Sequence, residues 1–296
     1  MVGKISVVIP NYNGIDLLKK NLPIIISSTR DYAPDAEIIV ADDASTDESV
    51  AFLRGLAGVK IIKLTKHRGF SSTINSGIKM SKGDFVVLLN NDVIPEKGYL
   101  ENSIKHFKDK NVFAVSFHEK GYGWARGYFK DGYVNHEGVL GEDKVHESFW
   151  VNGGSGIFRK EQLRDLGYFD DKLFSPFYWE DIDLSYRAAK RGLKVLWDPD
   201  SNVIHNHEST TGKISKRTRN YIVERNQLLF IWKNITSPIL FRKHLIGLFG
   251  RLARQPMYLR IVIAALLKIG IVKSKRQIEK KEAKVSDEAI FLRFSK

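Results

Sequence analysis

Residues 5–14 read Ile-Ser-Val-Val-Ile-Pro-Asn-Tyr-Asn-Gly, a short apolar run that ends in a polar turn. A run of four to eight apolar, β-branched residues bounded by turn residues is typical of a strand buried on both faces. We therefore expect a strand over residues 5–10 that brings Pro10 and Asn11 to its carboxyl end. The same pattern also fits an ordinary strand-to-loop junction, so it assigns no function by itself.

Outward from this stretch, the first two-thirds of the chain alternate β-branched runs with amphipathic segments. We expect strands over residues 5–10, 37–42, 59–64 and 85–90, and helices over 15–29, 47–56 and 71–80, the last capped by Ser71 or Ser72. This alternation predicts an α/β fold with a largely parallel sheet, which gathers functional residues at the carboxyl ends of its strands. The polar residues that fall at those ends are Asn11, Asp42, Asp43, Asn90, Asn91 and Asp92.

The rest of the chain is less uniform. Residues 112–149 predict short strands and loops, and a helix is expected over residues 181–191. A strand at 194–197 and a loop that holds His205 and His207 should follow. From residue 220 onward the pattern is helical and basic.

Residues 38–47, Ile-Ile-Val-Ala-Asp-Asp-Ala-Ser-Thr-Asp, place two carboxylates at the end of the second expected strand. Asp42 can accept a hydrogen bond from an N–H group of a nucleotide base. Helix capping by Ser45 or Thr46, with Asp47 in the first turn, explains the same segment. Both interpretations can hold, because Asp42 lies too early in the chain to cap that helix.

Residues 88–92, Leu-Leu-Asn-Asn-Asp, place another carboxylate after a strand. A nucleotide diphosphate leaving group needs a divalent cation, and Mg²⁺ or Mn²⁺ prefers oxygen ligands. Asp92 together with phosphate oxygens and water suffices for such a site, and His205 could complete it. A plain Asn-Asn-Asp turn and an incidental surface histidine pair are the ordinary alternatives.

Residues 179–184, Trp-Glu-Asp-Ile-Asp-Leu, hold three carboxylates within four positions beside aromatic residues. Capping by Asp181 accounts for one of them, and a purely solvated face explains the set poorly. A partly buried carboxylate with a raised pKa suits general-base chemistry on a hydroxyl group.

The composition is that of a globular protein with 43% hydrophobic residues and a formal net charge of +13. Residues 213–296 hold 20 Lys and Arg against 5 Asp and Glu, so this segment carries the whole excess. A basic segment of this kind faces nucleic acid or an anionic membrane. The absence of Cys excludes a disulfide framework, a zinc-thiolate site and a cysteine nucleophile.

No run reaches the 18 apolar residues expected of a membrane-spanning helix, and residues 1–5 lead into the first apolar run without the pattern expected of a secretory signal. Residues 241–272 mix apolar and basic residues, which fits a helix lying in the interface of an anionic membrane. A helical hairpin packed on the main domain is the alternative. We accordingly expect a cytoplasmic chain, peripheral on the inner face of the cell membrane.

Taken in order, these motifs resemble the family 2 glycosyltransferases of the GT-A fold over about residues 4–230, most of all rhamnosyltransferase-like members that build surface polysaccharides. The matching segments are residues 8–13, 41–47, Arg68-Gly69-Phe70 with Asn75 and Gly77, 88–92, 152–156, 179–184, His205 and Arg225-Asn226. The sequence departs from the stricter family pattern at Asn90, where Asp is usual, and at His67, where Asn is common.

The resemblance implies an inverting, metal-dependent transfer of a sugar from a nucleotide-diphosphate sugar to a glycan or lipid-linked glycan. Asp181 would be the catalytic base, and Asp92 with His205 would bind Mg²⁺ or Mn²⁺. Gly153, Gly154, Trp179 and Glu180 would contact the acceptor or the donor sugar. The nucleotide sugar would be bound by Pro10, Asn11, Asp42, Arg68, Asn75, Asn90 and Asn91.

The resemblance also implies a domain division. Residues 1–230 would form the GT-A domain, with nucleotide-sugar binding over 1–110 and the acceptor and catalytic part over 111–230. Residues 231–296 would form a basic helical extension. Three other functions stay open: a nucleic-acid-binding protein, for which no recognition motif is present, a nucleotidyltransferase, which lacks its glycine-rich basic loop, and a non-catalytic assembly protein.

Overall fold

A computed structural model of the chain describes residues 3–140, 143–205 and 215–295. One mixed sheet organises the fold, with strand order β3-β2-β1-β4-β10-β6-β11-β5 and β9 paired to β11, beside a separate β7-β8 hairpin. The strands are β1 (Ile5–Asn11), β2 (Glu37–Asp42), β3 (Val59–Lys63), β4 (Phe85–Leu89), β5 (Val93–Pro95), β6 (Val112–Glu119), β7 (Ala125–Lys130), β8 (Tyr133–Gly138), β9 (His146–Glu147), β10 (Ser155–Arg159) and β11 (Lys194–His205).

Helices cover both faces of this sheet, because alternate residues of the buried strands point to opposite sides. Val7 and Ile9 of β1 pack with α1 and α4, whereas Val8 packs with α3, α5 and α6. The helices that flank the sheet are α1 (Ile15–Tyr32), α2 (Ser49–Arg54), α3 (Phe70–Met80), α4 (Tyr99–Ile104), followed by the 3₁₀ turn η1 (Lys105–Lys108), α5 (Lys160–Asp165) and α6 (Glu180–Lys190).

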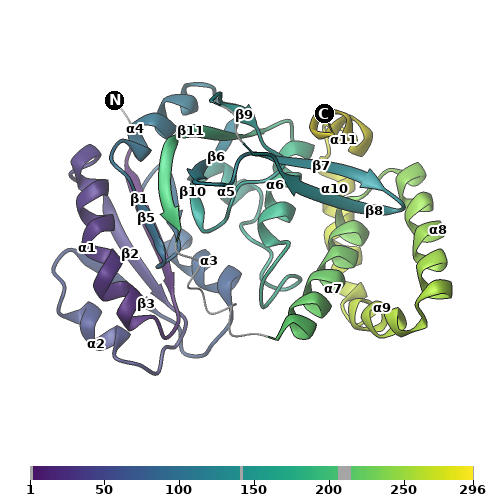
Figure 1. Cartoon of the computed structure of the whole chain (residues 1–296), viewed down its shortest axis with the longest axis horizontal. Helices are drawn as coiled ribbons and strands as arrows, with labels where there is room; N and C mark the ends of the chain where they lie inside the picture. Colours follow the sequence, from purple (N-terminus) through teal and green to yellow (C-terminus); the bar gives the residue numbers. More distant parts are fainter. Residues whose placement is uncertain (1–2, 141–142, 206–214, 296) are drawn as a thin grey trace.

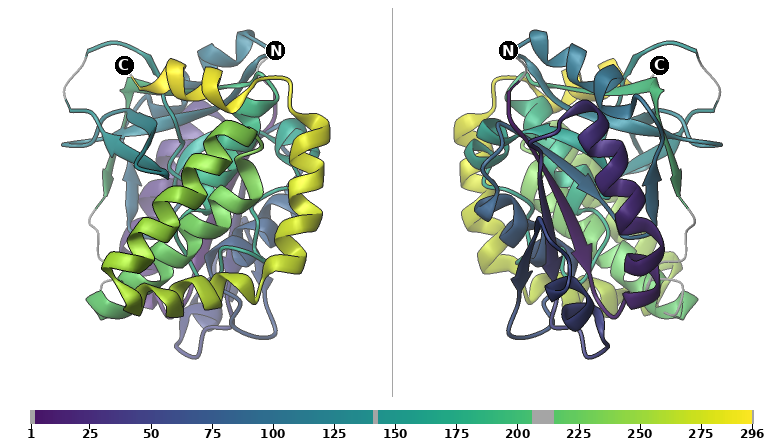
Figure 2. Two further views of the ribbon diagram at one scale, coloured as in Figure 1. Left: turned by 90° about the vertical axis from the view of Figure 1, so that its right-hand side faces the viewer. Right: turned by 90° about the vertical axis from the view of Figure 1, so that its left-hand side faces the viewer.

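A third layer of helices gathers on the side of the molecule away from β3 and α2 (Figure 1). Its core joins the β7-β8 hairpin and α6 to residues of the last five helices, so the helical extension is packed on the sheet domain. In the left view of Figure 2, these helices lie in front of the sheet and cover that side of the molecule. They are α7 (Lys216–Asn234), α8 (Pro238–Arg254), the 3₁₀ turn η3 (Pro256–Tyr258), α9 (Leu259–Leu266), α10 (Ile269–Glu282) and α11 (Asp287–Phe294).

The predicted fold class is confirmed, and the four expected strands agree with β1 to β4 within one residue at their ends. The expected caps are wrong. Helix α3 begins at Phe70 after Gly69, whose φ of +86° favours glycine, and no side chain caps it. Helix α2 begins after Glu48, also without a side-chain cap, because Ser45 is used by Asn11 and Asn13 instead.

Two further expectations need correction. Strand β11 continues to His205, so this histidine ends a strand and does not lie in a loop, whereas His207 lies outside the described residues. The segment 241–272 is not one helix, because Pro256 has no N–H to donate and separates α8 from α9. No helix within 3–140, 143–205 or 215–295 is long and apolar enough to cross a membrane.

Candidate active site

One edge of the sheet collects most of the predicted site residues. Strands β1, β2 and β4 are parallel, and β6 and β11 run the same way, because the intervening β10 is antiparallel to both β4 and β6. The start of β10 therefore meets the ends of its neighbours, with Ser155 opposite Leu89. This edge holds Asn11, Asp42, Asn90, Asn91, Asp92, Glu119, Gly153, Gly154 and His205.

Asn11 connects the ends of three strands. Its Nδ2 donates to Asp42 Oδ2 at 3.0 Å and to Ser45 Oγ at 3.2 Å. Its Oδ1 accepts from Asn91 Nδ2 at 3.0 Å. Asp42 Oδ1 accepts from the backbone N–H of Ser45 at 2.9 Å, and the Asp42 side chain is fully buried. The side chains predicted to bind the nucleotide are thus held in one fixed polar cluster.

Asp43, next to Asp42, binds the backbone of the loop before α3. Asp43 accepts from the backbone N–H groups of Arg68 and Gly69, at 2.7 and 2.8 Å, and lies 2.9 Å from His67 Nδ1. The His67 ring in turn stacks on Tyr12, with ring centroids 4.1 Å apart. Asp43 therefore holds the loop before α3 at the end of β2, and the His67–Tyr12 pair links the same loop to the turn after β1.

Asp92 and His205 come together at the other end of the edge. Asp92 Oδ1 lies 3.2 Å from His205 Nε2, and His205 Nδ1 lies 3.1 Å from Glu119 Oε2. Burial lowers the pKa of His205, but the hydrogen bond and charge of Asp92, followed by those of Glu119, outweigh it and leave the pKa raised. Asp92 is 1% exposed, and its Oδ2 has no hydrogen-bond partner among the described residues.

Asp92 and His205 alone could not complete the ligand set of a cation. Within the described ranges no three His, Asp or Glu side chains converge as a ready-made metal cage. A buried carboxylate oxygen without a donor is costly unless a cation or water meets it. Asp92 Oδ2 and the ring of His205, oriented by Glu119, fit a divalent cation that takes its remaining ligands from phosphate and water.

Two glycines let the chain pass close to this edge. A Cβ on Gly154 would come within 2.3 Å of Asn90 Nδ2, and the Gly154 carbonyl accepts from the Asn90 backbone N–H at 2.8 Å. A Cβ on Gly153 would lie 3.5 Å from the Cβ of Asp181. The Gly153-Gly154 segment therefore joins the strand end at Asn90 to the first turn of α6.

Asp181 lies in that first turn and is partly exposed. Burial raises its pKa to about 6, although the backbone N–H groups of Ile182, Asp181 itself and Gly153 act in the opposite direction. Its Oδ1 accepts from the Ile182 N–H at 2.8 Å. A carboxylate of this kind is ionised near neutral pH and still basic enough to take a proton from a hydroxyl group.

The neighbouring carboxylates have other surroundings. Burial, with repulsion from Asp181 and Asp183, raises the pKa of Glu180 well above its usual range. Asp183 is fully buried, and burial alone would raise its pKa, but Lys233 and Arg187 hold it below its usual range. Lys233 Nζ lies 2.7 Å from Asp183 and 2.9 Å from Asp170. Only Asp181 combines a partly exposed carboxylate with a pKa near neutrality.

Hydrogen bonds from a side chain of α7 stabilise the turn before α6. Tyr178 and Trp179 have φ values of +69° and +75°, a conformation that costs energy for residues other than glycine. Asn226 of α7, fully buried, donates through Nδ2 to three backbone carbonyls. They belong to Phe174, Phe177 and Tyr178, at 3.2, 3.0 and 2.9 Å.

Other predicted residues have less direct positions. Asn75 bonds the backbone of Phe169 with both ends of its amide, so it braces α3 against that loop. Trp179 and Glu180 are 4% and 6% exposed, which leaves little of their surface for a sugar. The side chain of Arg68 is exposed, and Pro10 pairs with Ala41 beside Asn11.

Sequence reasoning missed the site roles of three residues. Glu119 ends β6 in a region that showed no clear pattern, although a carboxylate at a strand end is a usable signal. Asp43 was not assigned a role because its neighbour Asp42 was taken as the functional carboxylate of that segment. Asn226 was part of a matching motif without any indication of its contacts.

Comparison with known proteins agrees with this arrangement. The profile of Glycosyl transferase family 2 matches residues 6–164. The uncharacterized glycosyltransferase YwdF of Bacillus subtilis is 32% identical over 68% of this chain and 74% of its own length. The pre-mycofactocin glycosyltransferase of Mycobacterium tuberculosis is 26% identical over 69% of this chain. The poly-beta-1,6-N-acetyl-D-glucosamine synthase of Staphylococcus aureus is 24% identical over 64%. The chain spans 43% and 46% of the length of the last two.

Solved structures support the same fold. GalNAc-T7, solved with UDP, GalNAc and Mn²⁺, has a TM-score of 0.66 at 17% identity and covers 87% of this chain and 57% of its own. The mannosyltransferase PcManGT of Pyrobaculum calidifontis, solved with GDP-Man and Mn²⁺, has a TM-score of 0.58 at 17% identity, with coverage of 100% and 86%. The fold is GT-A, and the match of the family profile to more than half of the chain shows that this protein belongs to glycosyl transferase family 2.

Proposed function

We propose that this glycosyltransferase moves a sugar from a nucleotide-diphosphate sugar to an acceptor hydroxyl with inversion, and that Asp181 is the catalytic base. The observation that carries the proposal is the raised pKa of a partly exposed Asp181 at the sheet edge that holds Asn11, Asp42 and Asp92. Asp181 takes the acceptor proton as the hydroxyl oxygen bonds to the anomeric carbon and the bond to the diphosphate breaks. One such displacement inverts the anomeric configuration.

The donor lies along the edge, with its base toward Asn11 and Asp42 and its diphosphate toward Asp92. Pro10, Arg68, Asn75, Asn90 and Asn91 surround this path as the remaining proposed donor contacts. Support comes from the fixed polar cluster around Asn11. UDP and GDP-Man are bound by the two structural neighbours, which share the fold.

Asp92 and His205 would hold Mg²⁺ or Mn²⁺. The buried Asp92 Oδ2 without a donor and the His205 ring oriented by Glu119 are the features that fit a cation. The cation would neutralise charge on the departing diphosphate, so that no general acid is required.

The acceptor we propose is a glycan or lipid-linked glycan of the cell surface, reached from the inner face of the membrane by a peripheral protein. A relative that synthesises poly-beta-1,6-N-acetyl-D-glucosamine supports a role in surface polysaccharide synthesis. Gly153 and Gly154 would line the sugar side of the site, with only the small exposed parts of Trp179 and Glu180 beside them. Residues 1–230 would carry the reaction and residues 231–296 the attachment.

The test is release of nucleoside diphosphate from a panel of nucleotide sugars with Mg²⁺ or Mn²⁺. We expect metal-dependent hydrolysis of one donor that is lost in Asp181→Asn and Asp92→Ala. Asp35→Asn, an exposed carboxylate elsewhere on the chain, is the matched control and should keep the activity. Release of pyrophosphate instead, or turnover that survives Asp181→Asn, would refute this function.

A further inference from the structure

Exposed hydrophobic side chains concentrate on one part of the molecule. Ten of the eighteen large hydrophobic residues that are exposed in the described chain lie between residues 239 and 271. Ile239, Ile246 and Phe249 of α8 are 64–68% exposed, and Met257 and Leu267 reach 73% and 83%. Soluble surfaces scatter such residues singly, so their concentration on α8, η3 and α9 indicates an interaction surface.

The inner faces of the same helices are already packed. Leu240 and Leu248 of α8 and Ile261 of α9 are buried in the core that joins the extension to the sheet domain. His244 accepts from Trp232 Nε1 at 2.9 Å and bonds the Gly132 carbonyl at 2.8 Å. Helices α8 and α9 are therefore already packed on the domain through their inner faces. Their exposed apolar side chains form a second, outward face that is not needed for this packing.

The segment that carries this side has charges of one sign, although Asp131 of the β7-β8 turn lies beside Lys243 and Arg254. Residues 225–278 contain eleven Lys and Arg and no Asp or Glu. Arg242, Lys243, Arg254 and Arg260 are exposed between the apolar side chains. Two copies of this face in a symmetric dimer would bring like charges together, whereas lipid phosphates would neutralise them.

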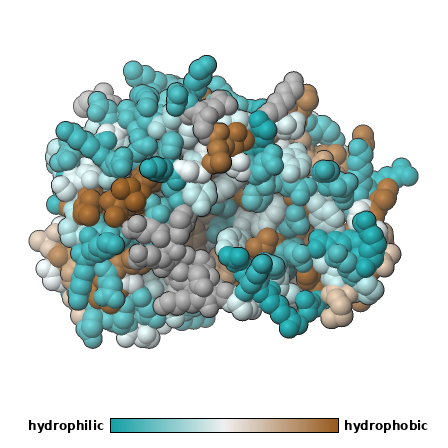
Figure 3. All heavy atoms as spheres, in the orientation of Figure 1, coloured by the Kyte–Doolittle hydropathy of each residue, from teal (hydrophilic) through white to brown (hydrophobic). Residues whose placement is uncertain are grey.

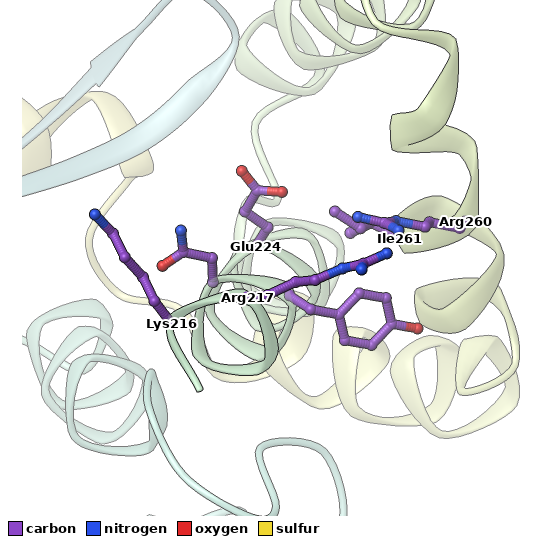
Figure 4. A pocket seen from close by; sticks show the side chains of 7 residues that line it. Lys216, Arg217, Glu224, Arg260 and Ile261 are labelled. Atoms are coloured by element: carbon purple, nitrogen blue, oxygen red, sulfur yellow. The ribbon is translucent and has the colours of Figure 1, made fainter. Parts of the chain in front are cut away.

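The same charge extends into a hollow between α7 and α9. Figure 4 shows Arg217 of α7 and Arg260 of α9 reaching into that hollow from its two facing walls, with Ile261 beside Arg260 and Glu224 on the α7 wall. The face in Figure 3, by contrast, is mostly hydrophilic, with hydrophobic residues along its right-hand edge where α8 lies in Figure 1. Basic and apolar groups thus meet along α8 and α9.

We propose that this surface docks the protein in the interface of an anionic membrane, which deepens the proposed function by presenting the site to a membrane-borne acceptor. The α8–α9 surface consists of Ile239, Leu245, Ile246, Phe249, Met257, Leu259, Ile263, Leu266 and Leu267 with Arg242, Lys243, Arg254 and Arg260. Its apolar side chains enter the boundary between headgroups and acyl chains, and its basic side chains bind lipid phosphates. Figure 2 shows α8 and α9 on the side opposite the nucleotide half of the sheet.

The test is co-sedimentation of the full chain with vesicles of phosphatidylcholine, with and without phosphatidylglycerol. We expect binding to the anionic vesicles that weakens with salt. Each basic residue near such a surface contributes on the order of a fivefold change in binding, so Arg242→Glu with Lys243→Glu should weaken it by at least about 25-fold. Ile246→Ser with Phe249→Ser should weaken it comparably. Lys19→Glu with Lys20→Glu, exposed on α1, should have little effect.

Two results would overturn the proposal. One is equal binding by the wild type and both α8 variants. The other is a stable dimer without lipid that Phe249→Ser dissociates, which would assign the surface to a second copy. Donor hydrolysis without vesicles, measured on the same proteins, separates the two proposals. Its absence in the wild type counts against the transferase function, whereas unchanged hydrolysis in the variants shows that only docking was altered.

Discussion

At the scale of single residues, α6 shows how position sets the chemistry of like side chains. Glu180, Asp181 and Asp183 lie within four positions, but burial without a cation raises the pKa of the first and two buried cations lower that of the last. Asp181 lies between these extremes, with backbone N–H groups limiting the effect of burial. The sequence predicted Asp181 as the base and Glu180 as a sugar contact, and the structure shows how differently their surroundings act on the three neighbouring carboxylates.

The pKa of Asp181 predicts the pH dependence of the reaction. A base must be ionised to act, so kcat should rise with pH through about 6 and level off above it. Asp181→Asn should lower kcat by about 100- to 10,000-fold and remove this rise. The measurement is kcat against pH at saturating donor and acceptor. A flat profile in the wild type would contradict the assignment.

Glu119 yields a prediction about the proposed metal site. Its carboxylate orients the His205 ring, and loss of such a partner usually weakens metal binding by about 10- to 100-fold. We expect Glu119→Gln to require correspondingly more Mn²⁺, both for activity and for thermal stabilisation by Mn²⁺ with nucleoside diphosphate. Glu137→Gln, an exposed carboxylate of β8, is the control. An unchanged Mn²⁺ titration would show that Glu119 does not act on the metal.

At the scale of elements, regular strands were predictable and long-range contacts were not. The runs at 5–10 and 37–42 are apolar apart from Ser6, Glu37 and Asp42 because β1 and β2 are buried on both faces, and this leaves a direct trace in the sequence. The contact of Glu119 with His205 joins residues 86 positions apart and leaves no local pattern. The predicted capping residues of α2 and α3 were wrong because Gly69 and the hydrogen bonds around Asn11 determine how these two helices begin.

Helix α7 illustrates such a hidden contact and yields a prediction. Asn226→Ala removes the donor shared by the carbonyls of Phe174, Phe177 and Tyr178, and buried acceptors left unpaired cost about 1–3 kcal/mol each. We expect a lower melting temperature and a lower kcat with little change in the donor KM, because the turn that presents Asp181 loosens.

A control on the same helix separates this effect from general weakening of α7. Gln227→Ala removes one bond, to the carbonyl of Val134 in the β7-β8 hairpin, and leaves the turn intact. It should lower stability modestly without lowering kcat. If Asn226→Ala kept the wild-type kcat, the turn would not depend on this side chain.

At the scale of the whole molecule, the extension and the sheet domain share one interior. The core of α7 to α11 includes Phe149 and Tyr186 of the sheet domain. Buried ion pairs cross the same boundary, from Asp183 and Asp170 to Lys233, and from Asp170 to Lys275 at 2.9 Å. The sequence showed the basic excess of this segment but could not show which lysines are neutralised inside and which remain on the surface.

These pairs predict how stability depends on pH. Lys233→Met leaves Asp170 and Asp183 with one cation fewer, and breaking a buried pair in this way usually costs about 3–5 kcal/mol. Burial opposes ionisation, but Lys233 and its basic neighbours lower the pKa of both carboxyls below their usual values. Their stabilising effect is therefore complete above the unfolded Asp value of about 3.9 and is lost as pH falls through the folded values.

Urea unfolding of the wild type and Lys233→Met at several pH values checks this directly. The free energy of unfolding should differ most near neutral pH, and the difference should shrink in acid as the carboxyls take up protons and no longer need the lysine. Lys280→Met, exposed on α10, should match the wild type throughout. A difference that grows in acid would mean that Lys233 stabilises the fold by packing. The ion pairs would then not be the interaction that holds α7 on α6.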